Sequence, residues 1–473
     1  MTDFPLTKEE WYSKRDDRTI RVDGAKGFEH YSVGVIIGDS VRSDYSLQVL
    51  ALTAVNILAR WCRQITIEMP SNVNSQLPTS RGEDYCKLLK DVTEMADPYN
   101  DFSFDVVSEE SVDRVLAVGS PERRFHSDQV FADGAGWLSG VRLGREPLDL
   151  PASLDANPVG PAFSACLAVA EIFRLACGTS SPEPHTDWYS LWNCDLLEDA
   201  PSGHHGFPHV RELDLGLIYQ IGCGAVGSCL DFLLSMSELQ GNILLIDYDK
   251  CSVTDCNRSM IFGACDGLLG KSKILVCEKA FESTRVVPHH FEGDYSTYIA
   301  TGQYLKNPPD AVLCLANEYN VWETIQQNFP PIVLHATTTI NWGLNLGRHL
   351  PKLDWCILCR FRDEVRATFR PPCAEGTITT TESSDRPIVG VLPFLSPAAA
   401  VLVLAELIRV ASGKLSSCNF MQHSMRSHST GFMKMLRSPD PRCICASQSL
   451  SVYPDQIKKT KFWYLPTSTK KGE

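Results

Sequence analysis

Two kinds of hydrophobic pattern alternate along the first third of the chain. Residues Tyr31–Gly38 form a nearly continuous apolar run, which is typical of a strand buried on both faces of a sheet. Residues Leu47–Trp61 then place apolar side chains at helical spacing. Short β-branched runs and a long apolar helix follow at Ile65–Glu68, Arg114–Val118 and Pro161–Cys177. This succession of buried strands and helices predicts an α/β fold.

The second half shows the same succession. A glycine-rich turn separates one apolar strand from a helix that runs to about Leu239. The other predicted elements are strands at Leu215–Ile221, Asn242–Asp247, Ala311–Leu315 and Pro331–Ala336, and a long helix at Ser396–Ala411. Parallel strands that are joined by helical crossovers fit this order.

Composition changes between residues 179 and 212, where Ser, Pro, His, Asp and Gly cluster. Such a stretch is typical of a linker. The chain has 473 residues, and single cores rarely grow beyond about 250 residues. We therefore predict a first domain at 1–178, a linker at 179–212, a second domain at 213–447 and a C-terminal tail at 448–473.

Two segments far apart in the chain resemble each other. Ala170–Gly178 (AEIFRLACG) and Ala405–Gly413 (AELIRVASG) share the same residue at A, E, R, A and G. One explanation is that apolar helices ending in glycine look alike. We favour the other, that the chain holds two copies of one fold, with a degenerate glycine loop in the first copy.

Charge and composition exclude several classes of protein. The balance of basic and acidic residues is 44 − 57 = −13, so no basic field draws the chain to nucleic acid. The apolar run Gly390–Ala405 is short for a membrane span, and the N-terminus shows no signal-peptide pattern. We expect a cytoplasmic protein whose 18 cysteines are reduced.

One motif that carries chemistry is the glycine loop Gly222-Cys-Gly224-Ala-Val-Gly227, which follows a strand and opens a helix. Glycines at these positions allow a tight turn and a close approach of the backbone to phosphate. Asp247 and Asp249 end the next strand, where a carboxylate can accept hydrogen bonds from ribose hydroxyls. A nicotinamide dehydrogenase would share these features, so the motif alone leaves the nucleotide open.

Two cations at fixed positions point to a family. The run from Gly222 to Lys273 resembles the adenylation domain of ubiquitin-like-protein activating enzymes, the ThiF/MoeB/HesA superfamily, in its order of GxGxxG, DxD, NxxR and GxxK motifs. The resemblance implies a Rossmann-like adenylation fold, with Asp249 at the ribose. It also implies that Arg258 and Lys273 are catalytic cations at the triphosphate of ATP.

The chain departs from the family pattern at two places. Asp255 stands where the family has an asparagine three residues before the arginine, and Asn257, the nearest asparagine, is our candidate for a contact with the nucleotide. Asn317 stands where the family has the aspartate that binds Mg²⁺. Because magnesium prefers carboxylates, Glu318 or Asp255 could compensate. These two departures affect the expected magnesium site more than the expected nucleotide site.

Cysteine spacing gives a second signal. Cys356 and Cys359 form a CxxC pair, and Cys443 and Cys445 form a CxC pair after the long helix. Two such pairs in a reduced chain predict a structural Zn²⁺ bound by four thiolates. The superfamily has CxxC pairs in the same places. The pairs His204-His205 and His289-His290 lack a third ligand at suitable spacing and are interpreted as loop residues.

Cys373 lies between these pairs, before the segment Gly390-Val-Leu-Pro393. Relatives place a cysteine there, on a loop that crosses over the acyl adenylate, and the resemblance implies that Cys373 captures the acyl group as a thioester. A thiolate suits this step because the adenylate is already activated. The alternatives are that Cys373 is a fourth ligand of the zinc site or a bystander thiol.

The resemblance implies that the chain uses ATP and Mg²⁺ to adenylate the C-terminal glycine of a ubiquitin-like protein, for delivery to a conjugating enzyme. Compact bacterial activating enzymes of this kind include some linked to phage defence. A monomeric pseudo-dimer or a homodimer is expected, with an arginine from the other copy: Arg15, Arg18 or Arg42. Activation of a sulfur carrier and a non-catalytic scaffold remain alternatives.

Overall fold

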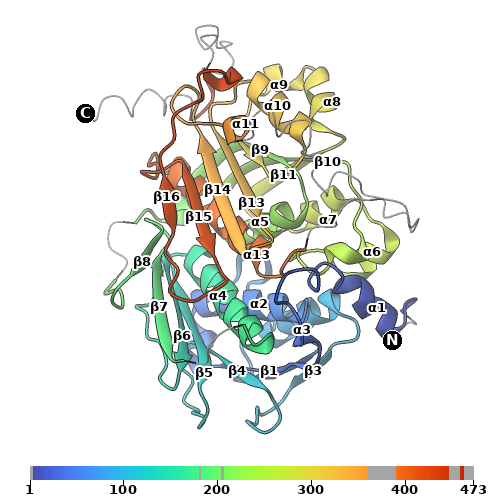
Figure 1. Cartoon of the computed structure of the whole chain (residues 1–473), viewed down its shortest axis with the longest axis vertical. Helices are drawn as coiled ribbons and strands as arrows, with labels where there is room; N and C mark the ends of the chain where they lie inside the picture. The colour runs from blue at the N-terminus through green and yellow to red at the C-terminus, as the bar shows by residue number, and fades with distance from the viewer. Residues whose placement is uncertain (1–3, 180–182, 204–206, 361–389, 447–458, 463–473) are drawn as a thin grey trace.

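The structure is a computed structural model of the chain, and it describes residues 4–179, 183–203, 207–360, 390–446 and 459–462. Each half of the described chain forms one eight-stranded sheet. In Figure 1 the sheet of the first half lies below and the sheet of the second half lies above, with helices between them.

The first sheet has the strand order β3-β2-β1-β4-β5-β6-β7-β8. Its neighbours from β3 to β5 pair in parallel, and those from β5 to β8 pair antiparallel. The strands are β1 (Ser32–Ile37), β2 (Gln64–Glu68), β3 (Asp101–Phe104), β4 (Arg114–Val118), β5 (Gln129–Ala135), β6 (Leu138–Gly144), β7 (His185–Ser190) and β8 (Asp195–Leu197).

The second sheet repeats this topology, with the order β11-β10-β9-β12-β13-β14-β15-β16. Pairing is again parallel up to β13 and antiparallel from there to β16. The strands are β9 (Asp214–Ile221), β10 (Gln240–Asp247), β11 (Val286–Glu292), β12 (Ala311–Cys314), β13 (Val333–Thr338), β14 (Gly343–His349), β15 (Phe420–Ser424) and β16 (Met433–Met435).

Four apolar helices pack against one another between the two sheets. They are α2 (Tyr45–Ala59), α4 (Val159–Ala176), α5 (Ala225–Ser235) and α13 (Leu395–Ala411). Their side chains belong to one continuous hydrophobic core that includes residues of both halves, so the halves share a core. Among the described residues, only α4 is long and apolar enough to cross a membrane, and 89% of that segment is buried inside the protein.

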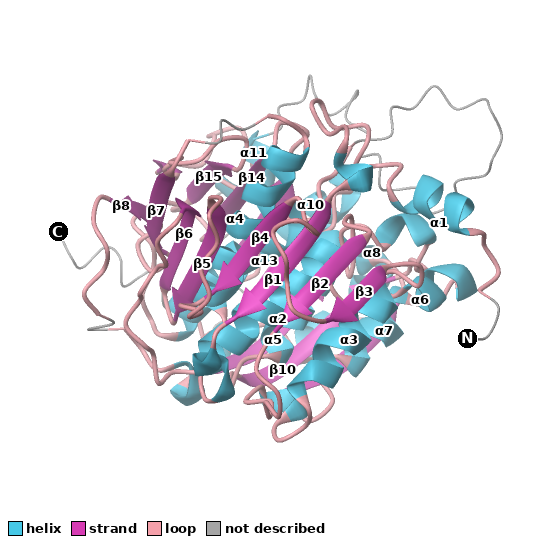
Figure 2. Cartoon of the chain, turned by 90° about the horizontal axis from the view of Figure 1, so that it is seen from below, coloured by secondary structure: helices cyan, strands magenta, loops and turns pink. Residues whose placement is uncertain are grey.

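Shorter helices lie around these four helices and at the ends of the sheets; seen from below in Figure 2, strands β1 to β4 of the first sheet face the viewer with no helix in front of them. The shorter helices are α1 (Lys8–Arg15), α3 (Tyr85–Ala96), α6 (Ala264–Leu269), α7 (Lys273–Lys279), α8 (Tyr295–Ala300), α9 (Gln303–Lys306), α10 (Tyr319–Gln327) and α11 (Ile357–Arg360). Helix α1 belongs to the first half of the chain but contacts a short turn of the second half, Val253–Asp255.

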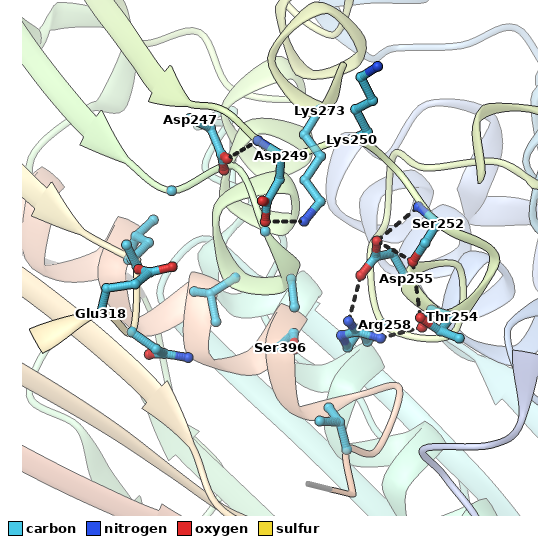
Figure 3. Close-up of a pocket in the computed structure, with 18 of the residues that line it drawn as sticks. Asp247, Asp249, Lys250, Ser252, Thr254, Asp255, Arg258, Lys273, Glu318 and Ser396 are labelled. Atoms are coloured by element: carbon cyan, nitrogen blue, oxygen red, sulfur yellow. Dashed lines mark hydrogen bonds and ion pairs between the residues drawn. The ribbon is translucent and has the colours of Figure 1, made fainter. Parts of the chain in front are cut away.

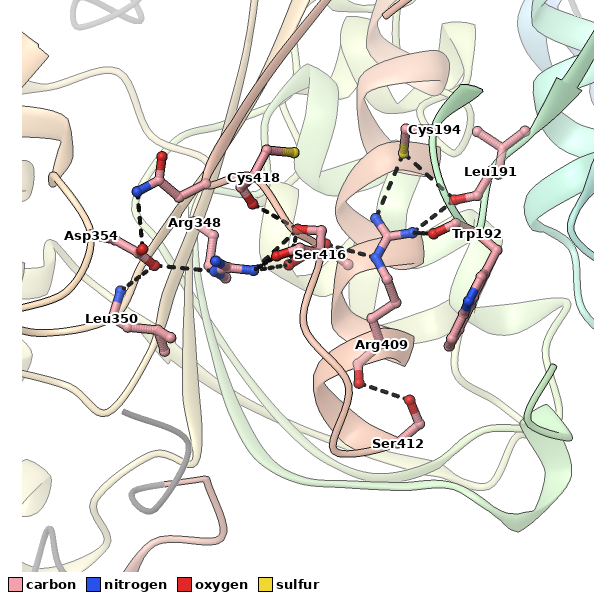
Figure 4. Close-up of polar contacts among 12 residues, drawn as sticks. Leu191, Trp192, Cys194, Arg348, Leu350, Asp354, Arg409, Ser412, Ser416 and Cys418 are labelled. Atoms are coloured by element: carbon pink, nitrogen blue, oxygen red, sulfur yellow. Dashed lines mark hydrogen bonds and ion pairs between the residues drawn. The ribbon is translucent and has the colours of Figure 1, made fainter. Parts of the chain in front are cut away.

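Buried arginines also join the halves. Near the end of α13, Arg409 pairs with Glu406 at 2.8 Å and donates to the carbonyl oxygens of Leu191 at 2.7 Å and Trp192 at 3.0 Å (Figure 4). Both charged side chains are almost fully buried. Such a guanidinium is held by an ion pair and by backbone acceptors, which offset the cost of burying its charge.

The structure corrects two expectations. Residues 179–212, predicted as a linker, include β7 and β8, which complete the first sheet. The strand β7 (HTDWYS) is polar, and its pairing with β6 rather than its own hydrophobicity makes it a strand. His289 and His290, interpreted as loop residues, lie in the edge strand β11; His204 and His205 lie outside the described residues.

Candidate functional site

A cavity of about 730 Å³ opens at the carboxyl ends of β9, β10 and β12. In the sheet, the chain runs outward from β9 through β10 to β11 and then returns to β12 on the other side of β9, so the strand order reverses between β9 and β12. Ligands of open α/β sheets bind at such a switch point. The cavity is large enough for a nucleotide-sized ligand, and residues of both halves of the chain line it.

The glycine loop forms one wall of this cavity. Gly222 has φ +102°, and a Cβ there would lie 2.8 Å from the backbone nitrogen of Ala316, so glycine is required at this turn. A Cβ at Gly227 would lie 2.2 Å from the carbonyl oxygen of Gly222, which explains how α5 packs closely on the loop. At Gly224 a Cβ would meet nothing within 4 Å. The loop therefore leaves open space for a ligand to approach its backbone.

Asp247 and Asp249 have different roles. The Oδ2 of Asp247 accepts from the backbone nitrogen of Cys223 at 2.6 Å, and its Oδ1 accepts from the nitrogens of Tyr248 at 2.7 Å and Asp249 at 2.8 Å. Both carboxylate oxygens of Asp247 thus accept hydrogen bonds from backbone N–H groups, so this residue stabilises the conformation of the glycine loop. Asp249 points instead to Lys273, whose Nζ lies 2.9 Å from its Oδ2 (Figure 3).

Lys273 begins α7 and lies in an acidic setting. Burial opposes its charge, but Asp255, Asp249 and Asp247 together hold the pKa of Lys273 above its usual value. Its side chain is 10% exposed and lines the cavity. A permanently charged lysine at this place is suited to bind a phosphate.

Arg258 lies on a loop after β10, which we call the arginine loop and define as residues 252–262. Its Nη2 lies 2.5 Å from Oδ1 of Asp255, and its Nη1 donates to the backbone oxygen of Thr254 (Figure 3). Burial would raise the pKa of Asp255, but Arg258 and Lys273 hold it below its usual value. Arg258 and Asp255 both line the cavity.

Asn257 was predicted to contact the nucleotide, but the structure places it behind Arg258. It is fully buried and is not among the residues that line the cavity. Its oxygen accepts from Nη1 of Arg258 at 3.0 Å, and its amide donates to the hydroxyl of Thr19 at 3.2 Å. Asn257 therefore positions the arginine rather than binding a ligand.

Asn317 and Glu318 follow β12 and line the opposite wall of the cavity. The Oε2 of Glu318 is buried and has no hydrogen-bond partner among the described residues. Burial raises the pKa of Glu318, and the nearby Asp247 and Asp249 raise it further. A cation between these carboxylates would satisfy the unpartnered oxygen and reverse this repulsion.

The three arginines of the first half that the sequence left unranked lie in different places. Arg18 lines the cavity, and its charge contributes to the low pKa of Asp255. Arg15 is fully buried against Asp16 and Asp97. Arg42 is bound to the backbone oxygen of Ser71, outside the cavity lining. Arg18 is therefore the one of the three that can reach a ligand in this cavity.

Sequence reasoning missed several residues that line the cavity, among them Tyr248 and Ser396. Tyr248, between the two aspartates, is 50% exposed. Ser396 lies in the first turn of α13, which brings this helix end to the cavity (Figure 3). The position of Tyr248 inside the DxD motif could have indicated it, whereas nothing in the sequence pattern places Ser396 beside β9.

The corresponding end of the first sheet has different residues. Gly38 follows β1 as Gly222 follows β9, but a Cβ at Gly38 would lie 3.2 Å from the backbone of Pro121. Glu68 ends β2 as Asp247 ends β10, and Arg123 lies 2.6 Å from its Oε2. A proline and an ion pair therefore occupy the region that the second half leaves open.

Four cysteines come together at the other end of the second sheet. Sγ–Sγ distances are 3.5 Å for Cys356 and Cys443, 3.3 Å for Cys359 and Cys445, and 3.8 Å for Cys356 and Cys359. Tetrahedral Zn²⁺ with bonds of about 2.3 Å needs sulfurs roughly 3.8 Å apart. The cluster fits a zinc ion and packs against α10. Cys373 lies outside the described residues.

Comparisons with known proteins match parts of the chain. Residues 32–184 match the family model of the BilD N-terminal domain. Similar solved structures are those of E. coli MccB with selenomethionine MccA (TM-score 0.38, 16% identity, 50% of this chain and 67% of that chain) and with ATP (0.38, 16%, 50% and 68%). The microcin C7 biosynthetic enzyme MccB with N-formylated MccA gives 0.37, 16%, 50% and 68%. No curated protein matches.

Proposed function

We propose that this protein binds ATP in the cavity of its second half and adenylates the C-terminal carboxylate of a ubiquitin-like protein that ends in glycine. One observation carries the proposal. An open glycine loop, an aspartate and two buried cations converge at the carboxyl ends of adjacent parallel strands. A nicotinamide enzyme needs the first two features but not Arg258 and Lys273 beside them.

The proposed step forms a mixed anhydride. A carboxylate oxygen of the partner attacks the α-phosphorus of ATP, the bond from that phosphorus to the bridging oxygen breaks, and pyrophosphate leaves. Negative charge accumulates on the phosphoryl oxygens and the leaving group, and Arg258 and Lys273 neutralise it. Asp249 orients the ribose through hydrogen bonds from its hydroxyls. The protein contributes position and charge rather than covalent chemistry.

Mg²⁺ belongs to this proposal, and the residues present fit it. Asn317 and Glu318 lie together at the end of β12, and Glu318 offers a buried oxygen with no hydrogen-bond partner among the described residues. Magnesium binds oxygen ligands and usually combines one or two carboxylates with substrate phosphates. It would supply charge neutralisation at the phosphates, while Glu318 provides the charge that Asn317 lacks.

We further propose that the chain is a pseudo-dimer of two copies of one fold. The repeated strand order supports this, as does the cavity lining contributed by residues of the first half. In this proposal the first copy is inactive, because Pro121 and the Arg123–Glu68 pair occupy its strand ends. It supplies Arg18 to the active copy as a further cation for the triphosphate.

The later steps of the proposal concern Zn²⁺ and Cys373. The four-cysteine cluster holds a structural zinc, and the thiolate of Cys373 attacks the acyl carbon of the adenylate, forming a thioester and releasing AMP. A conjugating enzyme then receives the acyl group. None of the described cysteines forms a disulfide, which supports a reducing compartment such as the cytoplasm.

ATP–pyrophosphate exchange tests the proposal. Purified protein is incubated with ATP, Mg²⁺, labelled pyrophosphate and a candidate carrier protein ending in glycine. Label should enter ATP only when the carrier is present and should be lost when the terminal glycine is removed. No exchange with any carrier, together with carrier binding, would identify a scaffold instead. A thiocarboxylate product in place of a reducible thioester would identify a sulfur-carrier pathway.

A further inference from the structure

The arginine loop is held in place by a helix of the other half of the chain. Arg60, at the C-terminal end of α2, donates from Nη1 to the carbonyl oxygens of Cys256 at 2.6 Å and Phe262 at 3.0 Å. Asn56, one turn earlier, donates to the carbonyl oxygen of Met260 at 2.9 Å. These three bonds fix the backbone on both sides of the residue that points into the cavity.

The two side chains form one unit. The Nε of Arg60 donates to Oδ1 of Asn56 at 3.0 Å, so each side chain orients the other. Both are fully buried. Thr19 adds a further contact from the first half, because its hydroxyl accepts from the amide of Asn257, which in turn accepts from Arg258.

Burying Arg60 is costly, and no carboxylate of the described residues offsets the cost. Burial lowers its pKa to about 10, and among the described residues no carboxylate forms an ion pair with it. Its hydrogen-bond acceptors are neutral, and its buried Nη2 has no hydrogen-bond partner among the described residues, so this buried charge is a poor way to stabilise an interface. The hydrogen bonds of Arg60 instead fix the shape of the arginine loop.

The contact is not repeated by the pseudo-symmetric elements. The loop after β2 is held within the first half, because Gln48 donates to the carbonyl oxygen of Asn74 at 3.0 Å and accepts from the nitrogen of Gln76 at 2.7 Å. The second half contributes to that loop an exposed ion pair between Glu238 and Arg81. The buried hydrogen bonds that cross from Asn56 and Arg60 to the second half are thus made only to the loop that carries Arg258, among the described residues.

We propose that Asn56 and Arg60 are positioning residues that hold Arg258 at the nucleotide cavity, so that the first half is a structural part of the active site in the second. The inference rests on the proposed adenylation for its kinetic consequence, but the contact itself is independent of it. Asn56 and Arg60 touch no ligand. They act through the backbone of residues 256–262.

Arg60→Met tests the proposal, because methionine fills a similar volume but cannot donate to the carbonyls. The matched control is Arg409→Met, which removes another buried arginine that crosses between the halves and donates to backbone carbonyls away from the cavity. Both variants are assayed as full-length protein at a temperature where far-UV circular dichroism shows them folded. Arg60→Met should lower the exchange rate about tenfold or more, since small misplacements of a catalytic group are costly, and Arg409→Met should not.

Two further measurements separate positioning from simple stability. In an Arg258→Ala background, Arg60→Met should cause no additional loss of exchange, whereas a general structural defect would multiply with the loss from Arg258→Ala. Arg60→Lys, which keeps one donor, should restore part of the rate. The proposal is overturned if Arg60→Met lowers the exchange rate by the same factor with and without Arg258→Ala. It is also overturned if Arg60→Met and Arg409→Met lower the exchange rate equally.

Hydrogen–deuterium exchange of residues 252–262 provides a test that does not need activity. Arg60→Met should speed exchange in this segment, and Arg409→Met should leave it at the wild-type rate. If the wild-type protein shows no ATP–pyrophosphate exchange, the proposed function fails while this measurement still decides the role of Arg60. If Arg60→Met leaves the hydrogen–deuterium exchange of residues 252–262 unchanged, the proposed role of Arg60 is overturned.

Discussion

Arg174 and Arg409 make equivalent contacts in opposite directions. Each lies three residues after a buried glutamate near the end of its helix, α4 or α13. Arg174 donates to the carbonyl oxygen of Met425, the residue after β15, and Arg409 donates to that of Leu191, the residue after β7. Because β7 and β15 occupy the same position in the two sheets, each half holds the other by the same device.

This reciprocity predicts that both arginines stabilise the shared core. Arg174→Met and Arg409→Met should each lower the free energy of unfolding by about 2–4 kcal/mol, because backbone acceptors and a glutamate lose a buried partner. Urea denaturation measures this as a lower midpoint. Arg145→Met, which removes an exposed arginine from a pair with Asp128, is the control and should keep the wild-type midpoint. A wild-type midpoint for both buried variants would contradict the account.

Local sequence predicted the glycine loop, the DxD strand end and the two cations, because each depends on a pattern within a few residues. It could not predict that Arg18 lines the cavity while Arg15 is buried, since the two differ only in their tertiary neighbours. The polar strand β7 was missed for a related reason: its pairing partner β6 lies some 45 residues earlier in the chain. Asn257 is the asparagine nearest to the family position in sequence, but its location behind Arg258 appears only in three dimensions.

The cysteine cluster predicts a bound metal. The purified protein should contain about one zinc per chain by elemental analysis, and Cys356→Ser or Cys443→Ser should lose it. Loss of the metal should destabilise the protein by several kcal/mol, because a structural zinc contributes folding energy directly. Cys418→Ser, at a buried cysteine outside the cluster, is the control and should retain the zinc. Metal-free wild-type protein with unchanged melting would rule out the site.

Glu318 predicts a specific pH dependence of magnesium use. Only the ionised carboxylate binds Mg²⁺, and burial raises the pKa of Glu318. Magnesium affinity should therefore fall as the pH is lowered, beginning at a higher pH than for an ordinary glutamate. Glu318→Gln should raise the Mg²⁺ concentration needed for half-maximal exchange and flatten this pH dependence. Glu323→Gln, one turn along α10 and outside the cavity lining, should match the wild type, and an unchanged Mg²⁺ requirement in Glu318→Gln would exclude Glu318 as a ligand.

Cys373 separates the two proposed chemical steps. Cys373→Ala should keep ATP–pyrophosphate exchange, because adenylation needs the glycine loop and the cations, but it should form no reducible adduct with the carrier. Cys373→Ser should form an oxyester slowly, since a hydroxyl is the weaker nucleophile, and should retain it, since an alkoxide is the poorer leaving group. Non-reducing gel electrophoresis with and without thiol measures the adduct. A thiol-sensitive adduct in Cys373→Ala would assign the capture step to another cysteine.

ATP–pyrophosphate exchange in the presence of a carrier ending in glycine tests the central claim most directly. Wild-type protein should show carrier-dependent exchange, and Asp249→Ala and Arg258→Ala should each reduce it at least about a hundredfold, the order expected when a transition-state contact is removed. Lys271→Ala, which removes a half-exposed lysine paired with Asp266, should leave it unchanged. Exchange in Arg258→Ala at the wild-type rate would contradict the assignment of this cavity as the site of adenylation.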